Sequence, residues 1–165
     1  MHPMKLECGF TWLEILAVLA VVGILALMAV PSLQETALRK QVKDALAIAE
    51  VAKAGVQAGY MLGGELPADN KAAGVPSPEK IVGTLVSGVT VKDGAITLEL
   101  GNSIHKSLAG KHVTIRPAVV PDEPRTPIAW LCHNMETPKG MEPRGRDDTD
   151  VPNEWLPLEC RGTAK

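Results

Sequence analysis

The chain opens with a long apolar stretch that changes, partway along, into a one-sided helical pattern. Residues 15–34 carry no charged side chain, and a helix of that length spans about 30 Å, the thickness of a bilayer core. From Ser32 to about Tyr60, apolar residues recur at three- and four-residue spacing. We therefore predict one N-terminal helix over residues 10–61, with a transmembrane segment at about 15–34 and an amphipathic second half. The apolar positions of that second half are Leu38, Val42, Ala45, Ala49, Ala52 and Val56.

Residues 62–165 predict a small head rich in strands. Gly59, Gly63-Gly64 and Pro67 are stop signals that place the helix end near Met61, and a loop rich in Pro and Gly follows. The run "VTVKDGAITLEL", residues 89–100, alternates apolar and polar residues on both sides of Asp93-Gly94, which predicts a hairpin.

Two further strands are predicted at residues 112–120 and 127–132. Pro117 lacks a backbone N–H and indicates that its strand is broken or at an edge. The predicted fold class is α+β, in which a small antiparallel sheet packs on the amphipathic stripe of the long helix.

Charge and cysteine content narrow the function classes. The net charge is −2 and no run of Lys and Arg forms a basic block, so composition gives no reason to expect nucleic acid as a partner. The cysteines are Cys8, Cys132 and Cys160. If Cys8 is removed with a leader, an even pair remains, and in an exported protein an even pair is most simply a disulfide.

No residue pattern indicates catalysis, a metal or a cofactor. Cys132-His133 and Cys160 lack the paired spacing of a zinc site, and a disulfide sulfur is not a thiolate nucleophile. The run "RGRDDTD" lacks the twelve-residue ligand pattern of a calcium loop, so we expect its carboxylates to be solvated. We expect a protein that is not an enzyme and needs no cofactor.

Glu14 is the one acidic residue in "GFTWLEILAVLAVVGILALMAVP", residues 9–31. This stretch resembles the N-terminal signature of bacterial type IV pilins and their pseudopilin relatives, in which a leader ending in Gly precedes Phe-Thr-Leu-Ile-Glu and an apolar helix with Gly and Pro. The matching positions here, apart from Trp12-Leu13, are Gly9, Phe10, Glu14, Gly23 and Pro31.

The resemblance implies a role for each of these residues. A prepilin peptidase would remove the leader, residues 1–9, by cutting between Gly9 and Phe10, and would methylate the new amine of Phe10. The carboxylate of Glu14 would pair with that amine on a neighbouring subunit during assembly. Gly23 and Pro31 would give the packed helices flexibility.

A second resemblance lies at the other end of the chain. "WLCHN" and "VPNEWLPLECRG" resemble the disulfide-bounded C-terminal loop of fimbrial pilins of the type IVa class. This likeness implies that Cys132 and Cys160 are joined and that residues 62–165 form a pilin head.

The function implied is that of a structural subunit of a type IV pilus. Before assembly the subunit would be anchored by a single pass in the lipid of the bacterial inner membrane, and afterwards it would be part of an extracellular filament. Its partners would be other pilin subunits, the prepilin peptidase and an inner-membrane assembly platform, and the filament would support adhesion, twitching motility or DNA uptake. Two alternatives remain open: a minor pilin or type II secretion pseudopilin, and an anchored binding domain that never polymerises.

The mature N-terminus distinguishes these classes. We expect mass spectrometry of the protein from its producing cell to find a chain that begins with N-methylated Phe10. A mature chain that retains Met1 would instead indicate the plain membrane anchor.

Overall fold

The computed structural model describes residues 11–162, apart from the side chains of residues 28–33. The chain divides into two compact units, Met1–Thr36 and Ala37–Lys165. Gly9 and Phe10, the predicted cleavage and methylation positions, lie outside the described residues. Their roles therefore stay predictions.

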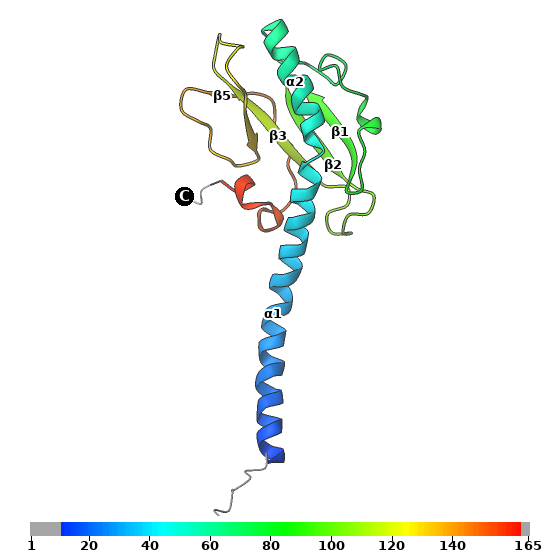
Figure 1. Cartoon of the computed structure of the whole chain (residues 1–165), viewed down its shortest axis with the longest axis vertical. Helices are drawn as coiled ribbons and strands as arrows, with labels where there is room; N and C mark the ends of the chain where they lie inside the picture. Colours follow the sequence, from blue (N-terminus) through cyan, green and yellow to red (C-terminus); the bar gives the residue numbers. More distant parts are fainter. Residues whose placement is uncertain (1–10, 163–165) are drawn as a thin grey trace, which may run out of the picture. The chain divides into compact units, whose positions relative to one another are not determined.

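Two consecutive α-helices, α1 (Trp12–Leu46) and α2 (Ala49–Gly63), occupy the predicted helical region (Figure 1). Between them the amide of Ala47 donates to the Asp44 carbonyl, three residues back, at 3.4 Å. The helical hydrogen bonds therefore change from a spacing of four residues to a spacing of three for one turn. The end of α2 is capped by Gly64 in a left-handed conformation, with φ of 73°. Gly59, expected as a stop signal, lies inside α2.

The amphipathic stripe packs against the sheet, as its spacing predicts. All its members are buried, and Tyr60 continues it toward the end of α2. Apolar residues of the strands form the other side of this core. Because both surfaces are removed from water, this contact is the main source of stability within the unit Ala37–Lys165.

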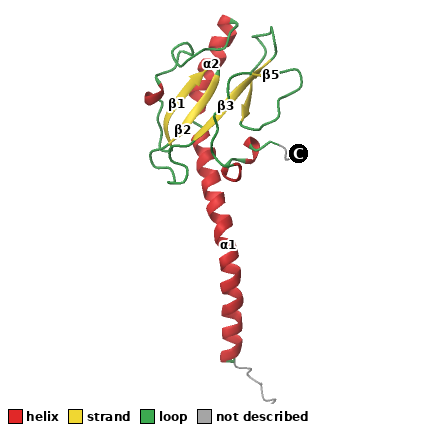
Figure 2. Cartoon of the chain, turned by 180° about the vertical axis from the view of Figure 1, so that it is seen from behind, coloured by secondary structure: helices red, strands yellow, loops and turns green. Residues whose placement is uncertain are grey.

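The sheet is antiparallel with strand order β1-β2-β3-β4, and a short fifth strand also pairs with β3 (Figure 2). The predicted hairpin is confirmed: Lys92 pairs with Ala95 across Asp93-Gly94, whose φ angles of 50° and 79° suit a tight turn between twisted strands. The strands are β1 (Val86–Lys92), β2 (Ala95–Leu100), β3 (His112–Val119), β4 (Ala129–Cys132) and β5 (Glu142–Pro143).

Pro117 does not break its strand or place it at an edge, so that prediction was wrong. Strand β3 is continuous and lies between β2 and β4. The Pro117 carbonyl accepts a hydrogen bond from the Arg144 amide at 2.8 Å, which shows that this backbone position faces away from β4. On that side the pairing with β2 stops at Ile115, so the missing N–H of Pro117 costs no bond of the main ladder.

The loop after α2 is fixed to the sheet by one buried amide. Asn70 is 6% exposed; its Nδ2 donates to the carbonyls of Pro76 at 2.8 Å and Val89 at 3.0 Å, and its Oδ1 accepts from the Val91 amide at 2.7 Å. All three bonds join the loop to itself or to β1. Satisfied polar contacts of Asn70 therefore fix this loop, in addition to the burial of Ala73 in the core.

The buried stripe can be tested with two identical substitutions in α2. Val56 is fully buried, whereas Val51 is 54% exposed. We expect Val56→Ala to lower the free energy of unfolding by about 2 kcal/mol, since it removes two buried carbons and leaves a cavity. Val51→Ala should change it by less than about 0.5 kcal/mol. Urea denaturation followed by tryptophan fluorescence measures both, and equal losses would show that the stripe is not the packed face.

Candidate functional site

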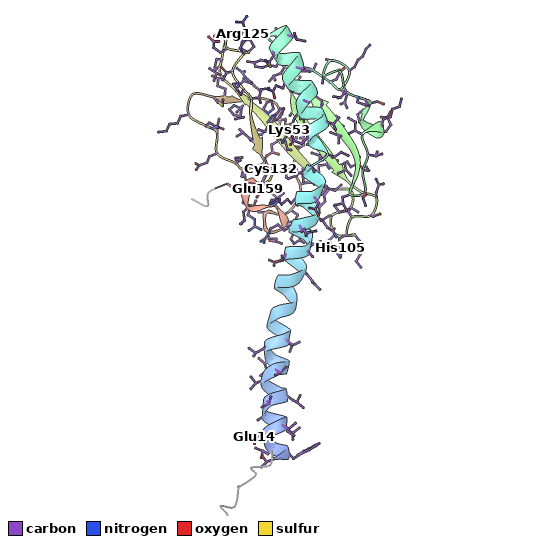
Figure 3. The ribbon with its side chains drawn as sticks, in the orientation of Figure 1. Glu14, Lys53, His105, Arg125, Cys132 and Glu159 are labelled. Atoms are coloured by element: carbon purple, nitrogen blue, oxygen red, sulfur yellow. A yellow bond between two sulfur atoms is a disulfide. The ribbon has the colours of Figure 1, made fainter. Side chains whose placement is uncertain are left out.

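Glu14 lies in the first turn of α1, and Thr11 directly precedes this helix (Figure 3). The Glu14 amide bonds to the Thr11 carbonyl at 3.0 Å and to its hydroxyl oxygen at 3.3 Å, the pattern of an N-terminal cap. The Glu14 side chain is exposed, and within the described residues no ion pair involves it. Its carboxylate is thus free to meet a cation from outside the described residues.

The first turns of α1, on both sides of Glu14 in the sequence, expose apolar side chains in every direction. This part of the helix has no polar face, whereas the helix beyond Thr36 is amphipathic. An apolar surface of this extent is typical of a segment that another molecule or a lipid phase covers. The exposed residues are Trp12, Leu13, Ile15, Leu16, Val18, Leu19, Val21, Val22, Ile24, Leu25 and Leu27.

Gly23 and Pro31 are both within α1. A Cβ on Gly23 would meet no neighbour within 4 Å. Across the part of the chain whose side chains are described, no helix combines the length and apolar character that a bilayer crossing needs. The predicted span 15–34 includes residues 28–33, whose side chains lie outside that part, so the membrane segment and the flexibility of both residues stay predictions.

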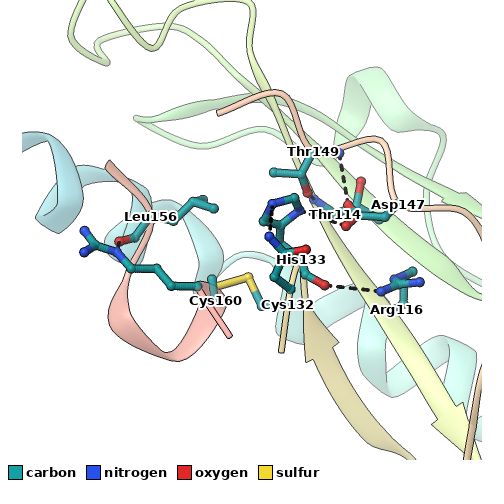
Figure 4. The surroundings of a disulfide bond; sticks show 10 residues. Thr114, Arg116, Cys132, His133, Asp147, Thr149, Leu156 and Cys160 are labelled. Atoms are coloured by element: carbon teal, nitrogen blue, oxygen red, sulfur yellow. Dashed lines mark hydrogen bonds and ion pairs between the residues drawn. A yellow bond between two sulfur atoms is a disulfide. The ribbon is translucent and has the colours of Figure 1, made fainter. Parts of the chain in front are cut away.

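Cys132 and Cys160 form the predicted disulfide (Figure 4). Cys132 ends β4, and Cys160 closes a short 3₁₀ helix, Leu158–Cys160. Both residues are buried. The bridge closes a loop with a sequence separation of 28, which by the chain-entropy relation stabilises the fold by about 3 to 4 kcal/mol.

The segment inside the disulfide is bound to β3 by backbone and short side chains. Its strand β5 pairs with Ala118 and Val119. Farther along, the Thr149 hydroxyl accepts from the Thr114 amide at 2.9 Å, and the Asp150 amide donates to the His112 carbonyl at 3.1 Å. These groups pair with the stretch of β3 that β4 does not reach, so the segment completes the sheet.

Asp147 corrects the expectation that the carboxylates of "RGRDDTD" are all solvated. One of its oxygens lies 2.8 Å from Nδ1 of His133, and the other accepts from the Thr149 amide at 3.1 Å. Burial alone would raise the pKa of Asp147, but the hydrogen bonds from Thr149 and His133 outweigh it and place this pKa below its usual value. Asp147 thus links the disulfide-bounded segment to His133, the residue that follows β4, through a charged side chain.

Two arginines connect the C-terminal segment around Glu154 to α1 by hydrogen bonds. Arg39 of α1 and Arg161 both donate to the Glu154 carbonyl, the former at 3.1 Å. Arg161 also donates to the Leu156 carbonyl at 3.0 Å. This contact holds the C-terminal side of the disulfide-bounded segment against the amphipathic half of the helix.

The sequence had not indicated the structural roles of His133, Asp147 and Asn70. Each of these residues bonds to partners distant in the chain and lies in a loop with no periodic pattern. Within the residues that the structure describes, no group of His, Cys, Asp and Glu is arranged to hold a metal ion.

The sequence that forms this helix, sheet and disulfide-bounded segment matches a known family. Residues 39–161 match the family model for pilin, a bacterial filament protein. The chain therefore belongs to the pilin family.

Curated relatives cover nearly the whole chain. The chain is 39% identical over 162 residues to the type IV major pilin protein PilE of Neisseria gonorrhoeae, covering 94% of this chain and 95% of the relative. It is 38% identical over 165 residues to a fimbrial protein of Neisseria meningitidis serogroup B, with 94% and 95% covered. A fimbrial protein of Pseudomonas aeruginosa is 30% identical over 149 residues, with 85% and 94% covered.

Asp147 makes stability depend on pH. Because its folded pKa is below the unfolded value of about 3.9, the carboxylate stabilises the fold above that value, and the stabilisation is lost as pH falls through the folded pKa. We expect Asp147→Asn to lower the free energy of unfolding at pH 7 by about 1.5 to 3 kcal/mol, typical of hydrogen bonds to a charged group.

That deficit should shrink in denaturation measured progressively below about pH 4. Asp148→Asn is the matched control, since its carboxylate pairs only at the surface with Arg146, at 2.7 Å. If the loss of unfolding free energy in Asp147→Asn stayed constant from pH 7 to pH 2, the charge of Asp147 would not stabilise the fold.

Proposed function

We propose that this protein is a structural subunit of a type IV pilus, polymerised through its N-terminal helix. The observation that carries the proposal is the uncovered apolar surface of α1 over residues 12–27 in a member of the pilin family. Identical helices packed side by side would bury this surface, as the sheet buries the amphipathic stripe. The relatives named as major pilins and fimbrial proteins support the same function.

Processing precedes assembly in this proposal. Prepilin peptidase cuts between Gly9 and Phe10 and methylates the new amine, so the leader leaves and the apolar helix stays. The subunit waits in the inner membrane, with the span at residues 15–34 in lipid, until the assembly platform transfers it to the extracellular filament. Methylation keeps the positive charge of the Phe10 amine while it removes a hydrogen-bond donor.

Glu14 sets the stagger between neighbouring subunits. Its carboxylate lies at the start of an apolar helix, where in a bundle it would be desolvated. Two opposite charges about 4 Å apart attract by about 1 kcal/mol in water and several times more at a lower effective dielectric. A desolvated charge without a partner is costly, so the Phe10 amine of a neighbour favours one register and disfavours the others.

The filament then supplies the biological activity. Adhesion, twitching motility and DNA uptake are all properties of an assembled fibre, and the subunit itself catalyses no reaction in this proposal. A role as a major subunit is favoured over a minor pilin or pseudopilin, because the relatives include major pilins that match over nearly their full length.

A single charge substitution tests the assembly role. We expect Glu14→Val, coexpressed with the unaltered chain in the producing cell, to reach the membrane at normal levels yet to be depleted at least tenfold from sheared filaments. Glu35→Gln is the control, since Glu35 is also an exposed acid on α1, and it should be incorporated normally. Quantitative mass spectrometry of membrane and filament fractions gives both ratios; equal incorporation of Glu14→Val would refute the pairing.

A further inference from the structure

A hollow of about 400 Å³ lies at the end of α2. Four segments of the unit Ala37–Lys165 line it: the end of α2 with Tyr60 and Glu65, the β1–β2 turn with Asp93, the chain after β3 with Asp122, and the disulfide-bounded segment with Arg144. Its volume is within the range of pockets that take small organic ligands. None of these residues belongs to the assembly site described above.

Tyr60 gives the hollow an unpartnered polar group. It is 6% exposed and is the chain's single tyrosine. It lines the hollow, and its hydroxyl makes no hydrogen bond with another described residue. This hydroxyl is not among the fully buried polar atoms that lack a partner, so it is the accessible end of an otherwise buried side chain. Here the hydroxyl is available to a molecule that enters.

The hollow is electronegative. Glu65, Asp93 and Asp122 are acidic residues of its lining, and all three are exposed. The end of α2 adds the negative pole of the helix dipole. The one cation of the lining, Arg144, is already 2.8 Å from the Glu142 carboxylate. The lining therefore favours a positive charge, and its apolar members Leu66 and Val119 favour a carbon stem.

We propose that this hollow binds an organic cation, an ammonium or guanidinium group on an apolar stem. The cation's N–H groups donate to the carboxylates and to the Tyr60 hydroxyl oxygen, while the stem packs against Leu66 and Val119. The same chemistry has two sources, a free aliphatic amine or a Lys or Arg side chain of a second copy of this chain.

Because Tyr60 is unique, it reports on the hollow alone. The full chain, purified in detergent with 3-fluorotyrosine, gives a single tyrosine-derived ¹⁹F signal. We expect 1,5-diaminopentane to move this signal along a saturable curve at constant ionic strength. 1-Pentanol, which has the stem without the charge, should not. An equal response to both compounds would overturn the proposal, since the hollow would then be merely apolar.

Two substitutions and a control test whether the acidic residues of the hollow bind the diamine. Asp122→Asn and Glu65→Gln should each weaken diamine binding about two- to fivefold, the range for exposed ion pairs. Asn suits position 122, where φ is 62°. Glu123→Gln removes an adjacent carboxylate that does not line the hollow and should leave binding unchanged. Equal effects of all three would contradict a local site.

The protein concentration separates the two sources. If the signal of the chain alone is constant as the chain is diluted and moves only with the diamine, the cation is a free amine. If it moves as the chain is concentrated and the diamine competes with that change, the cation comes from a second copy. A signal that responds to neither the diamine nor concentration would overturn the proposal.

Discussion

Burial of apolar helix surface is the interaction on which this structure depends. From Leu38 to Tyr60 the apolar helix surface is buried within the chain, because the stripe packs on the sheet. From Trp12 to Leu27 the same kind of surface is exposed on all sides of α1. At about 25 cal/mol per Å² of apolar area, such a surface strongly favours a covered state. The first stretch therefore explains the fold of the head, and the second is the surface that other subunits would cover in the proposed filament.

The disulfide-bounded segment shows how a small sheet is completed without a further long strand. Carboxylate, hydroxyl and backbone groups of residues 147–150 pair with the part of β3 that β4 does not reach. The bridge between Cys132 and Cys160 limits the disorder of this segment in the unfolded chain. Because the segment also contributes Arg144 to the hollow beside Tyr60, its attachment positions one wall of the proposed cation site.

The features that follow from local spacing could be predicted from the sequence. The buried stripe, the hairpin at Asp93-Gly94 and the Cys132–Cys160 pair all depend on near neighbours, on periodicity or on a count of cysteines. What could not be predicted depends on contacts between distant residues. Pro117 is tolerated in a central strand only because β2 ends before it, and neither the His133–Asp147 bond nor the hollow at Tyr60 leaves a periodic trace in the sequence.

In the proposed filament, the exposed stem of one subunit is buried among the stems of others. The most direct test is a thiol placed at Leu19, which is 61% exposed in the single chain. In a mature chain without Cys8, and with Cys132 and Cys160 joined, this is the sole reactive thiol. Burial among the stems predicts that Leu19→Cys resists a water-soluble maleimide in intact sheared filaments and reacts fully once denaturant separates the subunits. Equal reaction rates in the two states would contradict it.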